Sequence, residues 1–286
     1  MKSVAKFEVD HLLGKHVGTS TLLEELDRGG MGIIFIAYQR TLKRRIAIKI
    51  LPKSIITPEM SEIFQREAEA AAILSHPNII PIYEVGKTED FLFISMQLID
   101  GKPLSKYIEN AGKQLLPSRR ILPLQTTFRL IFQILDALEY AHQQEIVHRD
   151  VKPDNILIEK HTQRPILMDF GLVKVMREEE KGGQSAVRGT PLYMPPEQIL
   201  GRDIDHRADI YSIGVMLFEM LVSKLPLPEV ESMFSLITLK LQKKSNYFEK
   251  LPSEMNSNLH PDIDRIVMKA IAFDPNDRYS TCKALT

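Results

Sequence analysis

A short segment in the middle of the chain carries three side chains suited to proton and group transfer. Residues 146–157 read IVHRDVKPDNIL and include Asp150, Lys152 and Asn155. The carboxylate of Asp150 can accept a hydroxyl proton, and the ammonium of Lys152 can offset negative charge on a group in transfer. The amide oxygen of Asn155 can hold a divalent cation together with a carboxylate. The spacing predicts a catalytic loop.

A second carboxylate follows on a separate segment. Asp169 stands in the tetrapeptide Met-Asp-Phe-Gly, which follows an apolar segment predicted to be a strand. A carboxylate before a glycine hinge is a suitable ligand for Mg²⁺, which prefers oxygen donors. We expect Asp169 to complete a cation site with Asn155.

Glycines and a lysine near the N-terminus suggest a phosphate site. Gly29, Gly30 and Gly32 lie between two predicted strands, where glycines let backbone amides approach phosphate oxygens. Lys49 ends the apolar run IAIK fifteen residues after Ile34. Each signal alone is ambiguous, because glycines also make plain hairpin turns and a strand lysine can be a solvated edge charge.

The elements that must position these residues change in type along the chain. The first third alternates short aliphatic and β-branched runs with turns, which predicts an antiparallel sheet. Pro58 begins a helix rich in alanine and glutamate that the sequence His76-Pro77-Asn78 ends. The predicted strands are 21–26, 33–38, 45–51, 79–85 and 91–98, and the predicted helix is 58–74. A turn at Asp100-Gly101 places a lobe boundary near residue 99.

Beyond this boundary helices dominate. Residues 126–143 place apolar side chains three or four apart on one stripe, which is typical of a helix packed on a core. Residues 210–222 are almost wholly apolar but include Glu219 and are too short to cross a bilayer, so we interpret them as a buried core helix. The fold class is therefore α+β.

Composition limits the partners and the compartment. The chain has 286 residues, with 37 Lys+Arg against 37 Asp+Glu, so the net charge of zero creates no general field for nucleic acid. Cys282 is the single cysteine, which excludes an intrachain disulfide and a cysteine-based zinc site. The first residues carry charges throughout and contain no apolar stretch long enough to predict a signal peptide. We expect a cytoplasmic location, no nucleic-acid partner and no membrane segment in this chain, which can be one domain of a longer protein.

Together these motifs resemble the protein kinase superfamily over residues 22–282. The wording GGMG at 29–32 and YMPPEQ at 193–198 is similar to the eukaryotic-like (Hanks-type) Ser/Thr kinases of bacteria. The resemblance implies a bilobal protein kinase fold. Its N-lobe, residues 21–99, would be an antiparallel sheet with one helix, and this lobe would bind ATP. Its C-lobe, residues 100–286, would be mainly helical and would carry the catalytic and peptide-binding residues. Residues 1–20 form an N-terminal extension.

The resemblance implies ATP and Mg²⁺ as ligands. Gly29, Gly30 and Gly32 would cover the ATP phosphates, and Lys49 would hold the α- and β-phosphates. Glu67 is the expected ion-pair partner of Lys49, with Glu69 as the nearby competitor. The expected adenine and ribose contacts are Ile34, Ala47, Met96 as gatekeeper, the backbone of Gln97 and Ile99, Asp100 toward the ribose, and Leu157. Met96 and Leu98 are also compatible with ordinary strand core.

The same resemblance assigns the transfer step. Asp150 would be the base that aligns the substrate hydroxyl, Lys152 would contact the γ-phosphate, and Asn155 with Asp169 would bind Mg²⁺. Lys152 and the sequence Gly-Thr-Pro at 189–191 imply specificity for Ser and Thr. The expected activity is transfer of the ATP γ-phosphate to Ser/Thr hydroxyls of protein substrates. Autophosphorylation is also expected, and a homodimer is one arrangement in which one copy could phosphorylate the other.

Further residues are implied to support the site. Glu197 and Arg278 would form a buried ion pair, and Asp209 would bond the backbone of the catalytic loop. Thr190 would bridge Asp150 and Lys152. His148 and Phe170 would be packing residues, although a proton-transfer role for His148 stays open. His161 and His206 show no metal-ligand spacing and are interpreted as surface residues.

Several positions depart from the family pattern or concern regulation. Asp27 stands where the first loop glycine is usual, and Pro195 replaces the alanine of Ala-Pro-Glu; both can tune nucleotide affinity or loop rigidity. Arg149 before the catalytic aspartate is typical of kinases controlled by a phosphate on the activation segment. Ser185 is the candidate acceptor, and the glutamates at 178–180 are the alternative partner of Arg149.

Two rival functions remain at this stage. A catalytically silent nucleotide-binding scaffold, or pseudokinase, is disfavoured because Lys49, Asp150, Asn155 and Asp169 are all present. A small-molecule phosphotransferase is disfavoured by the peptide-binding sequence from Gly189 onward. The physiological substrate and the peptide preference cannot be deduced from the sequence.

Overall fold

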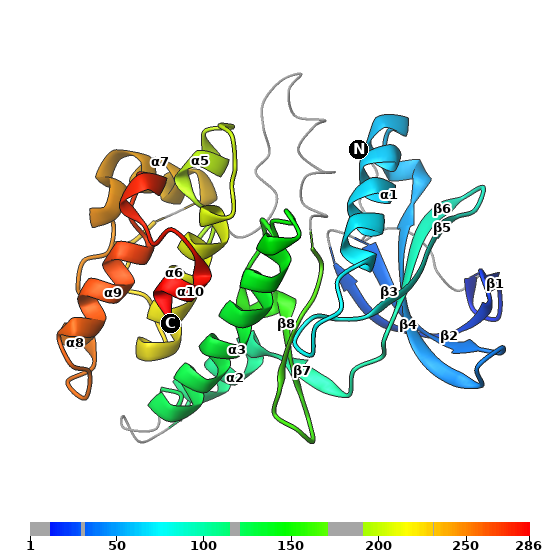
Figure 1. Ribbon diagram of the computed structural model, residues 1–286, viewed down its shortest axis with the longest axis horizontal. Coiled ribbons are helices and arrows are strands. Elements are labelled where there is room, and N and C mark those ends of the chain that lie inside the picture. Colours follow the sequence, from blue (N-terminus) through cyan, green and yellow to red (C-terminus); the bar gives the residue numbers. More distant parts are fainter. Residues whose placement is uncertain (1–11, 30–31, 115–120, 171–190, 231) are drawn as a thin grey trace. The chain divides into compact units, whose positions relative to one another are not determined.

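The computed structural model describes residues 12–29, 32–114, 121–170, 191–230 and 232–286 (Figure 1). The chain divides into two compact units. The first takes the described residues up to Asp100 together with Phe170, and the second runs from Gly101 to Asp169 and resumes at Pro191. Each unit has its own core.

The first unit contains an antiparallel sheet, as the sequence predicts. Every neighbouring pair of strands in it is antiparallel, and the strand order is β1-β2-β3-β4-β6-β5. The strands are β1 (His16–Val17), β2 (Ser20–Gly29), β3 (Gly32–Gln39), β4 (Arg44–Pro52), β5 (Ile82–Lys87) and β6 (Phe91–Met96). This sheet confirms the predicted architecture of the N-terminal part of the chain.

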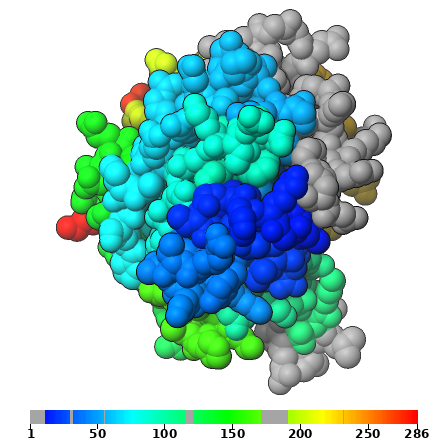
Figure 2. Space-filling model, turned by 90° about the vertical axis from the view of Figure 1, so that its right-hand side faces the viewer, coloured from blue at the N-terminus to red at the C-terminus, as the bar shows by residue number. Residues whose placement is uncertain are grey.

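Alternation along the strands builds the core of this unit. Ile33, Phe35 and Ala37 of β3 are buried, and Ile46, Ile48 and Ile50 of β4 meet them in register. Leu12 and Val17, which precede β2, are buried in the same cluster. In the space-filling view the residues of β1 and β2, in the darkest blue, form the surface nearest the viewer (Figure 2). Successive side chains of a strand point to opposite faces, so one face of the sheet is filled with aliphatic groups.

The helix of the first unit is α1 (Pro58–Ala72). The Thr57 side chain accepts a hydrogen bond from the Met60 N–H, and Pro58 occupies the first helical position, which needs no N–H donor. Ile63, Phe64 and Ala68 are among its buried residues. A short 3₁₀ turn, η3 (Lys53–Ile55), precedes it. The predicted helix is confirmed, although it ends two residues before the predicted end.

Several strand boundaries differ from the prediction. β5 begins at Ile82 rather than at 79, because Pro81 lacks the N–H that a strand ladder requires. β6 ends at Met96, since the next amide, Gln97 N–H, donates to the Pro81 carbonyl at 3.0 Å. β2 runs three residues beyond its predicted end and takes in Asp27 and Gly29.

The second unit combines a small sheet with helices. Its three strands are antiparallel and hydrogen-bonded in the order β7-β8-β9. They are β7 (Gly101–Pro103), β8 (Ile156–Glu159) and β9 (Pro165–Leu167). The described helices and 3₁₀ turns are α2 (Leu104–Gly112), α3 (Leu124–Gln143), η5 (Pro153–Asn155), α5 (Pro196–Ile199), α6 (Arg207–Val222), α7 (Met233–Lys243), η7 (Lys244–Asn246), α8 (Pro252–Met255), α9 (Asp262–Ala270), η8 (Pro275–Asp277) and α10 (Cys282–Leu285). The mainly helical character expected for this part is confirmed.

The core of the second unit is organised around α6. Most of its residues are buried, and it packs against α3, α8 and α9. Gly214 of α6 lies so close to α9 that an added Cβ would approach the Ala270 Cβ to 2.8 Å. The helix is therefore interior to the protein, as its composition predicts. In the part of the chain that the structure describes, no helix has the length and apolar character needed to cross a bilayer.

Candidate active site

The residues expected to hold the nucleotide share one face of the first unit's sheet. Lys49 of β4 pairs in register with Ile34 of β3, and Ala47 pairs with Met96 of β6. Directly opposed residues lie on the same face, and so do residues two apart on one strand. Ile34, Ala47, Lys49 and Met96 therefore occupy one face. Lys49 is only 3% exposed, which places its ammonium at a desolvated position rather than at a solvated edge.

The hairpin between β2 and β3 requires glycine at one position. Gly29 pairs with Gly32 at its end, and Gly32 has φ +130°, which side-chain-bearing residues rarely adopt. A Cβ on Gly32 would lie 2.5 Å from the Ile50 carbonyl oxygen of β4, whereas a Cβ on Gly29 would meet no atom within 4 Å. The absence of a Cβ at Gly32 thus allows the start of β3 to pack closely against β4, next to the Lys49 side chain.

We predict that Gly32→Ala lowers the stability of the first unit by about 2 kcal/mol and weakens nucleotide binding, because both φ and the contact with Ile50 become strained. Gly29→Ala is the matched control, with an expected change below about 1 kcal/mol. Thermal unfolding and calorimetric titration with Mg-ATP measure the two effects. Equal unfolding temperatures for the two variants would contradict the prediction.

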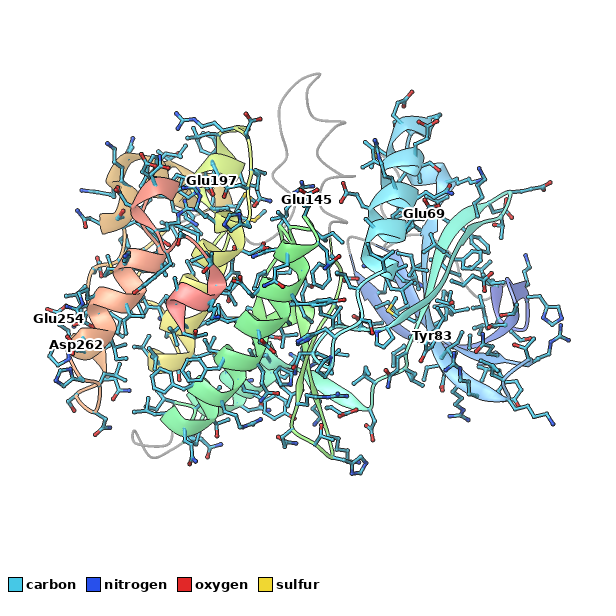
Figure 3. All side chains as sticks on the ribbon, viewed as in Figure 1. Glu69, Tyr83, Glu145, Glu197, Glu254 and Asp262 are labelled. Atoms are coloured by element: carbon cyan, nitrogen blue, oxygen red, sulfur yellow. The ribbon has the colours of Figure 1, made fainter. Side chains whose placement is uncertain are left out.

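The two glutamates that compete as partners of Lys49 lie on different sides of α1. Glu67 is half-buried and lies one helical turn from Ile63 and Ala71, which are buried. Glu69 is exposed and accepts a hydrogen bond from Gln65 of the same helix (Figure 3). Residues four apart share a helix face, so Glu67 belongs to the face that packs on the sheet. The position favours Glu67.

The segment after β6 carries the backbone expected to bond adenine. The Gln97 N–H already donates to the Pro81 carbonyl. The backbone group of Gln97 that can bond a ligand is therefore its carbonyl oxygen. Ile99 and Asp100 follow without regular secondary structure, which leaves their backbone groups outside any ladder. Leu157, the remaining adenine residue, lies on β8 of the second unit and is half-buried.

The predicted catalytic loop is brought together by hydrogen bonds in the second unit. The Lys152 ammonium lies 2.7 Å from Oδ2 of Asp150. Nδ2 of Asn155 donates to the same carboxylate oxygen and to the Asp150 carbonyl, both at 2.8 Å. The amide orientation follows from these bonds, because Nδ2 supplies two donors and Oδ1 then carries the acceptor lone pairs. The loop thus joins a carboxylate, an ammonium group and an amide oxygen.

His148 connects this loop to the strand that leads to Asp169. Its Nδ1 accepts the Asp150 N–H at 3.2 Å, and its Nε2 lies 2.7 Å from the Met168 carbonyl oxygen. With Nδ1 as an acceptor and Nε2 as a donor, the ring bridges two backbone segments. The Met168 N–H in turn donates to the Asn155 carbonyl at 2.9 Å. His148 is fully buried, which supports a packing and positioning role over proton transfer.

The backbone next to Asp150, and that of Asp169, is held in an unfavourable conformation. Arg149 has φ +65° and Asp169 has φ +61°, both in the left-handed region that costs side-chain-bearing residues about 1–2 kcal/mol. The Arg149 N–H donates to Oδ1 of Asp209 at 2.8 Å, and its carbonyl accepts from the Gln198 side chain at 3.0 Å. Bonds on both sides of Arg149 thereby fix the direction in which Asp150 points.

Asp209 is the buried anchor of this loop, as expected. Its Oδ2 accepts the His148 N–H at 2.8 Å and also faces Nε2 of His142 at 2.8 Å. Burial raises the pKa of Asp209, but the His142 hydrogen bond and the charges of His142 and His148 outweigh it, so the pKa is lowered overall. Its contribution to stability is present above the ordinary pKa of an aspartate and is lost as the pH falls through the lowered native value.

We predict that Asp209→Asn destabilises the protein by about 2 kcal/mol, because an amide NH₂ must then face a backbone N–H in a buried site. It should also lower phosphate transfer, since Asp150 is no longer held. The wild type should lose stability more steeply than the variant as the pH falls below the ordinary aspartate pKa toward the lowered pKa of native Asp209. Urea unfolding at pH 7 and pH 3.5 measures this, with the exposed Asp203→Asn as the control. A variant as stable as the wild type at pH 7 would contradict the prediction.

Other expectations meet different outcomes. Arg278 and Glu197 form the predicted buried pair, with Nη1–Oε1 at 2.7 Å, and Glu197 lies on α5 (Figure 3). His161 is exposed as expected. His206 is half-buried, so its surface interpretation holds in part: its Nε2 lies 2.7 Å from the Ser280 carbonyl oxygen, and its ring packs on His142.

The sequence reasoning missed Gln198 and His142, whose partners lie 49 and 67 positions away along the chain. No local signal marks either one. Gly30, Thr190, Ser185 and the glutamates at 178–180 lie outside the described residues, so their expected roles stay predictions. Asp27 lies in β2, where its Oδ1 accepts the Arg28 N–H, and Pro195 caps α5 with extended backbone.

Comparison with known proteins covers nearly the whole chain. The profile described as protein kinase domain matches residues 20–286. The serine/threonine-protein kinase PrkC of Bacillus subtilis is 34% identical over 274 residues, which span 95% of this chain and 40% of the relative. The tyrosine-protein kinase MasK of Myxococcus xanthus is 33% identical over 279 residues, which span 93% of this chain and 42% of the relative. The chain thus spans less than half of the length of either relative.

A solved structure has the same fold. The kinase domain of Mycobacterium tuberculosis PknI superposes with a TM-score of 0.73 over 95% of both chains, at 24% sequence identity. At this identity the likeness concerns the fold.

Proposed function

Because this chain belongs to the protein kinase family, we propose that it is the catalytic domain of an active Ser/Thr protein kinase. It would transfer the ATP γ-phosphate to Ser or Thr hydroxyls of protein substrates and of its own chain. Residues 21–99 would form the ATP-binding lobe, with 1–20 as an extension, and residues 100–286 would form the catalytic and peptide-binding lobe.

The observation that carries the proposal is the hydrogen-bonded group of Asp150, Lys152 and Asn155. Oδ2 of Asp150 accepts from both neighbours, so the carboxylate is fixed in orientation before any substrate binds. A fixed carboxylate can align a hydroxyl and take its proton as the oxygen attacks phosphorus. Lys152, 2.7 Å away, can move its ammonium toward the oxygens of the transferring phosphoryl group.

The donor set also fits Mg²⁺. Oδ1 of Asn155 and the carboxylate of Asp169 are oxygen donors suited to the ion. The Met168 N–H, one residue before Asp169, donates to the Asn155 carbonyl and so ties the two segments together. Within the described ranges, no group of three or more His, Cys, Asp or Glu side chains is placed to hold a metal ion. A pair of protein ligands is what Mg²⁺ commonly uses beside nucleotide phosphates. When bound, the ion would neutralise charge on the phosphate oxygens.

In the first unit, we propose that Lys49 holds the α- and β-phosphates and that Glu67 orients it. Gly29, Gly30 and Gly32 would cover the phosphates. Ile34, Ala47 and Met96, on the same sheet face as Lys49, would enclose the adenine ring with Leu157, and the Gln97 and Ile99 backbone and Asp100 would bind its edge and the ribose.

The acceptor specificity needs a direct test, because PrkC is named a serine/threonine kinase and MasK a tyrosine kinase. The chain is incubated with labelled Mg-ATP, alone and with myelin basic protein, and phosphoamino acids are separated after hydrolysis. Label on phosphoserine and phosphothreonine supports the proposal, and label on phosphotyrosine alone overturns the specificity. Label that grows faster than linearly with protein concentration would support autophosphorylation in trans within a homodimer.

The pseudokinase alternative predicts nucleotide binding without label on any protein. It has no specific observation in its favour, since Lys49, Asp150, Asn155 and Asp169 are present and the relatives are named kinases. Binding of Mg-ATP by calorimetry together with no incorporation would establish it.

A further inference from the structure

A lysine of the second unit is buried where its residue type is rare. Lys240 lies on α7 and continues the buried stripe formed by Leu236 and Ile237. Its side chain is 0% exposed. Lysine is almost never fully buried unless its ammonium has partners that replace water. The partners of Lys240 therefore show what it does in the fold.

The ammonium of Lys240 binds the segment that leads into α5. Its Nζ donates to the carbonyl oxygens of Pro191 at 3.0 Å, Leu192 at 2.8 Å and Met194 at 2.7 Å. A protonated lysine has three N–H donors, so these three acceptors satisfy it completely. The remaining carbonyl of the segment, Tyr193 O, accepts from the Ser212 hydroxyl at 2.9 Å. All four carbonyls of residues 191–194 are thus held by two side chains.

Aromatic rings complete the surroundings of the charge. Nζ of Lys240 lies 4.9 Å from the ring centroid of Tyr211 on α6 and 5.4 Å from that of Tyr247. Ring faces stabilise a cation at this range. The two hydroxyls lie 3.0 Å apart, and burial raises the pKa of both tyrosines, so both rings stay neutral.

The charged groups near Lys240 do not provide a dedicated carboxylate. Burial lowers the pKa of Lys240 well below the ordinary lysine value, the charge of Arg278 lowers it further, and Glu197 opposes both. Glu197 is already bound by both terminal nitrogens of Arg278. On the segment itself, the Tyr193 hydroxyl donates to Glu219 of α6. The backbone carbonyls are therefore the main compensation for the buried charge.

We propose that Lys240 is a positioning residue for the protein substrate, because its ammonium fixes residues 191–194 in the conformation that binds the peptide. The inference rests on the proposed kinase function. Of residues 191–196 only Leu192 is not buried, so the segment turns its carbonyls inward and offers that side chain outward. Gln198 lies on α5, which follows this segment, and its side chain donates to the Arg149 carbonyl next to Asp150. Fixing the segment thus places a bound peptide relative to the catalytic carboxylate.

Lys240→Met tests this, since methionine keeps the apolar stem and removes the three donors. Lys243→Met is the matched control, because Lys243 is exposed on the same helix. Backbone amides of residues 191–200 should exchange with deuterium about tenfold faster in Lys240→Met, as expected for lost charged hydrogen bonds. In Lys243→Met they should exchange as in the wild type.

The kinetic readout separates this role from general damage. In Lys240→Met the KM for myelin basic protein should rise about tenfold, while the KM for Mg-ATP changes less than about twofold. Lys240→Arg, which keeps donors for the carbonyls, should restore part of the affinity for the protein substrate. A folded Lys240→Met with unchanged exchange in residues 191–200 and an unchanged KM for the protein substrate would overturn the inference.

A pH series on the wild type provides a second test if Lys240→Met does not fold. A neutral amine has two N–H donors for three carbonyls, so exchange in residues 191–200, corrected for the intrinsic effect of pH, should rise as the pH increases toward the ordinary pKa of lysine. The KM for the protein substrate should rise in the same range, and Lys240→Arg should show neither change. A flat wild-type series would overturn the inference. An inactive wild type would instead refute the kinase proposal, and the exchange data would still decide the role of Lys240.

Discussion

Asp150→Asn is expected to lower phosphate transfer about 1000-fold while the affinity for Mg-ATP stays within about threefold of the wild type. The amide oxygen of asparagine can still accept from Lys152 or Asn155, whose donors lie 2.7 and 2.8 Å from Oδ2 in the wild type. The loop geometry should therefore survive. The variant loses the group that aligns the acceptor hydroxyl and takes its proton.

Initial rates of label incorporation into myelin basic protein measure this effect, and calorimetric titration with Mg-ATP measures binding. Asp154→Asn is the control, because it removes the same charge from an exposed position in the same loop. Its rate should stay within about tenfold of the wild type, as for residues outside the transfer step. Transfer by Asp150→Asn at more than a tenth of the wild-type rate would show that this carboxylate is not the base.

Arg278→Met is expected to destabilise the protein by about 3–5 kcal/mol, the usual consequence of leaving a buried charge without its partner. Both terminal nitrogens of Arg278 lie 2.7 Å from the Glu197 carboxylate. Its remaining N–H groups donate to the carbonyls of Ala272, Arg207 and Phe273. Methionine fills much of the volume but supplies none of these donors, so Glu197 and the carbonyls remain buried without compensation.

Urea unfolding at pH 7 gives the free energy of unfolding for this test. Arg265→Met is the control, since Arg265 pairs with Asp262 at 3.5 Å in an exposed position, where an ion pair contributes about 0–1 kcal/mol. The double variant Arg278→Met/Glu197→Met should be more stable than Arg278→Met, because it removes the stranded carboxylate. A loss below about 1 kcal/mol in Arg278→Met would mean that solvent reaches the pair.

The parts of the fold that short-range rules control were predictable from the residues themselves. Alternating side chains require β3 and β4 to bury one face, and Thr57 with Pro58 supplies a helix start wherever the chain goes next. Asp150, Lys152 and Asn155 lie within five positions of one another, so any compact turn brings them together. The strand boundaries that were predicted wrongly depend on contacts between distant parts of the chain. For example, the Gln97 N–H donates to the Pro81 carbonyl, and β6 therefore ends at Met96.

Contacts between residues far apart in the sequence could be predicted only from the family resemblance, or could not be predicted. Glu197 and Arg278 are 81 positions apart, and their pairing came from the family pattern rather than from any local signal. Lys240 looks in sequence like a solvated helix lysine, and the carbonyls it binds lie more than 45 positions earlier. Backbone geometry acts over a few residues, and it therefore fixes spacing and periodicity locally. Removal of water and the choice of buried partners follow from packing of the whole unit, which is why the roles of Lys240, His142 and Gln198 emerge only in three dimensions.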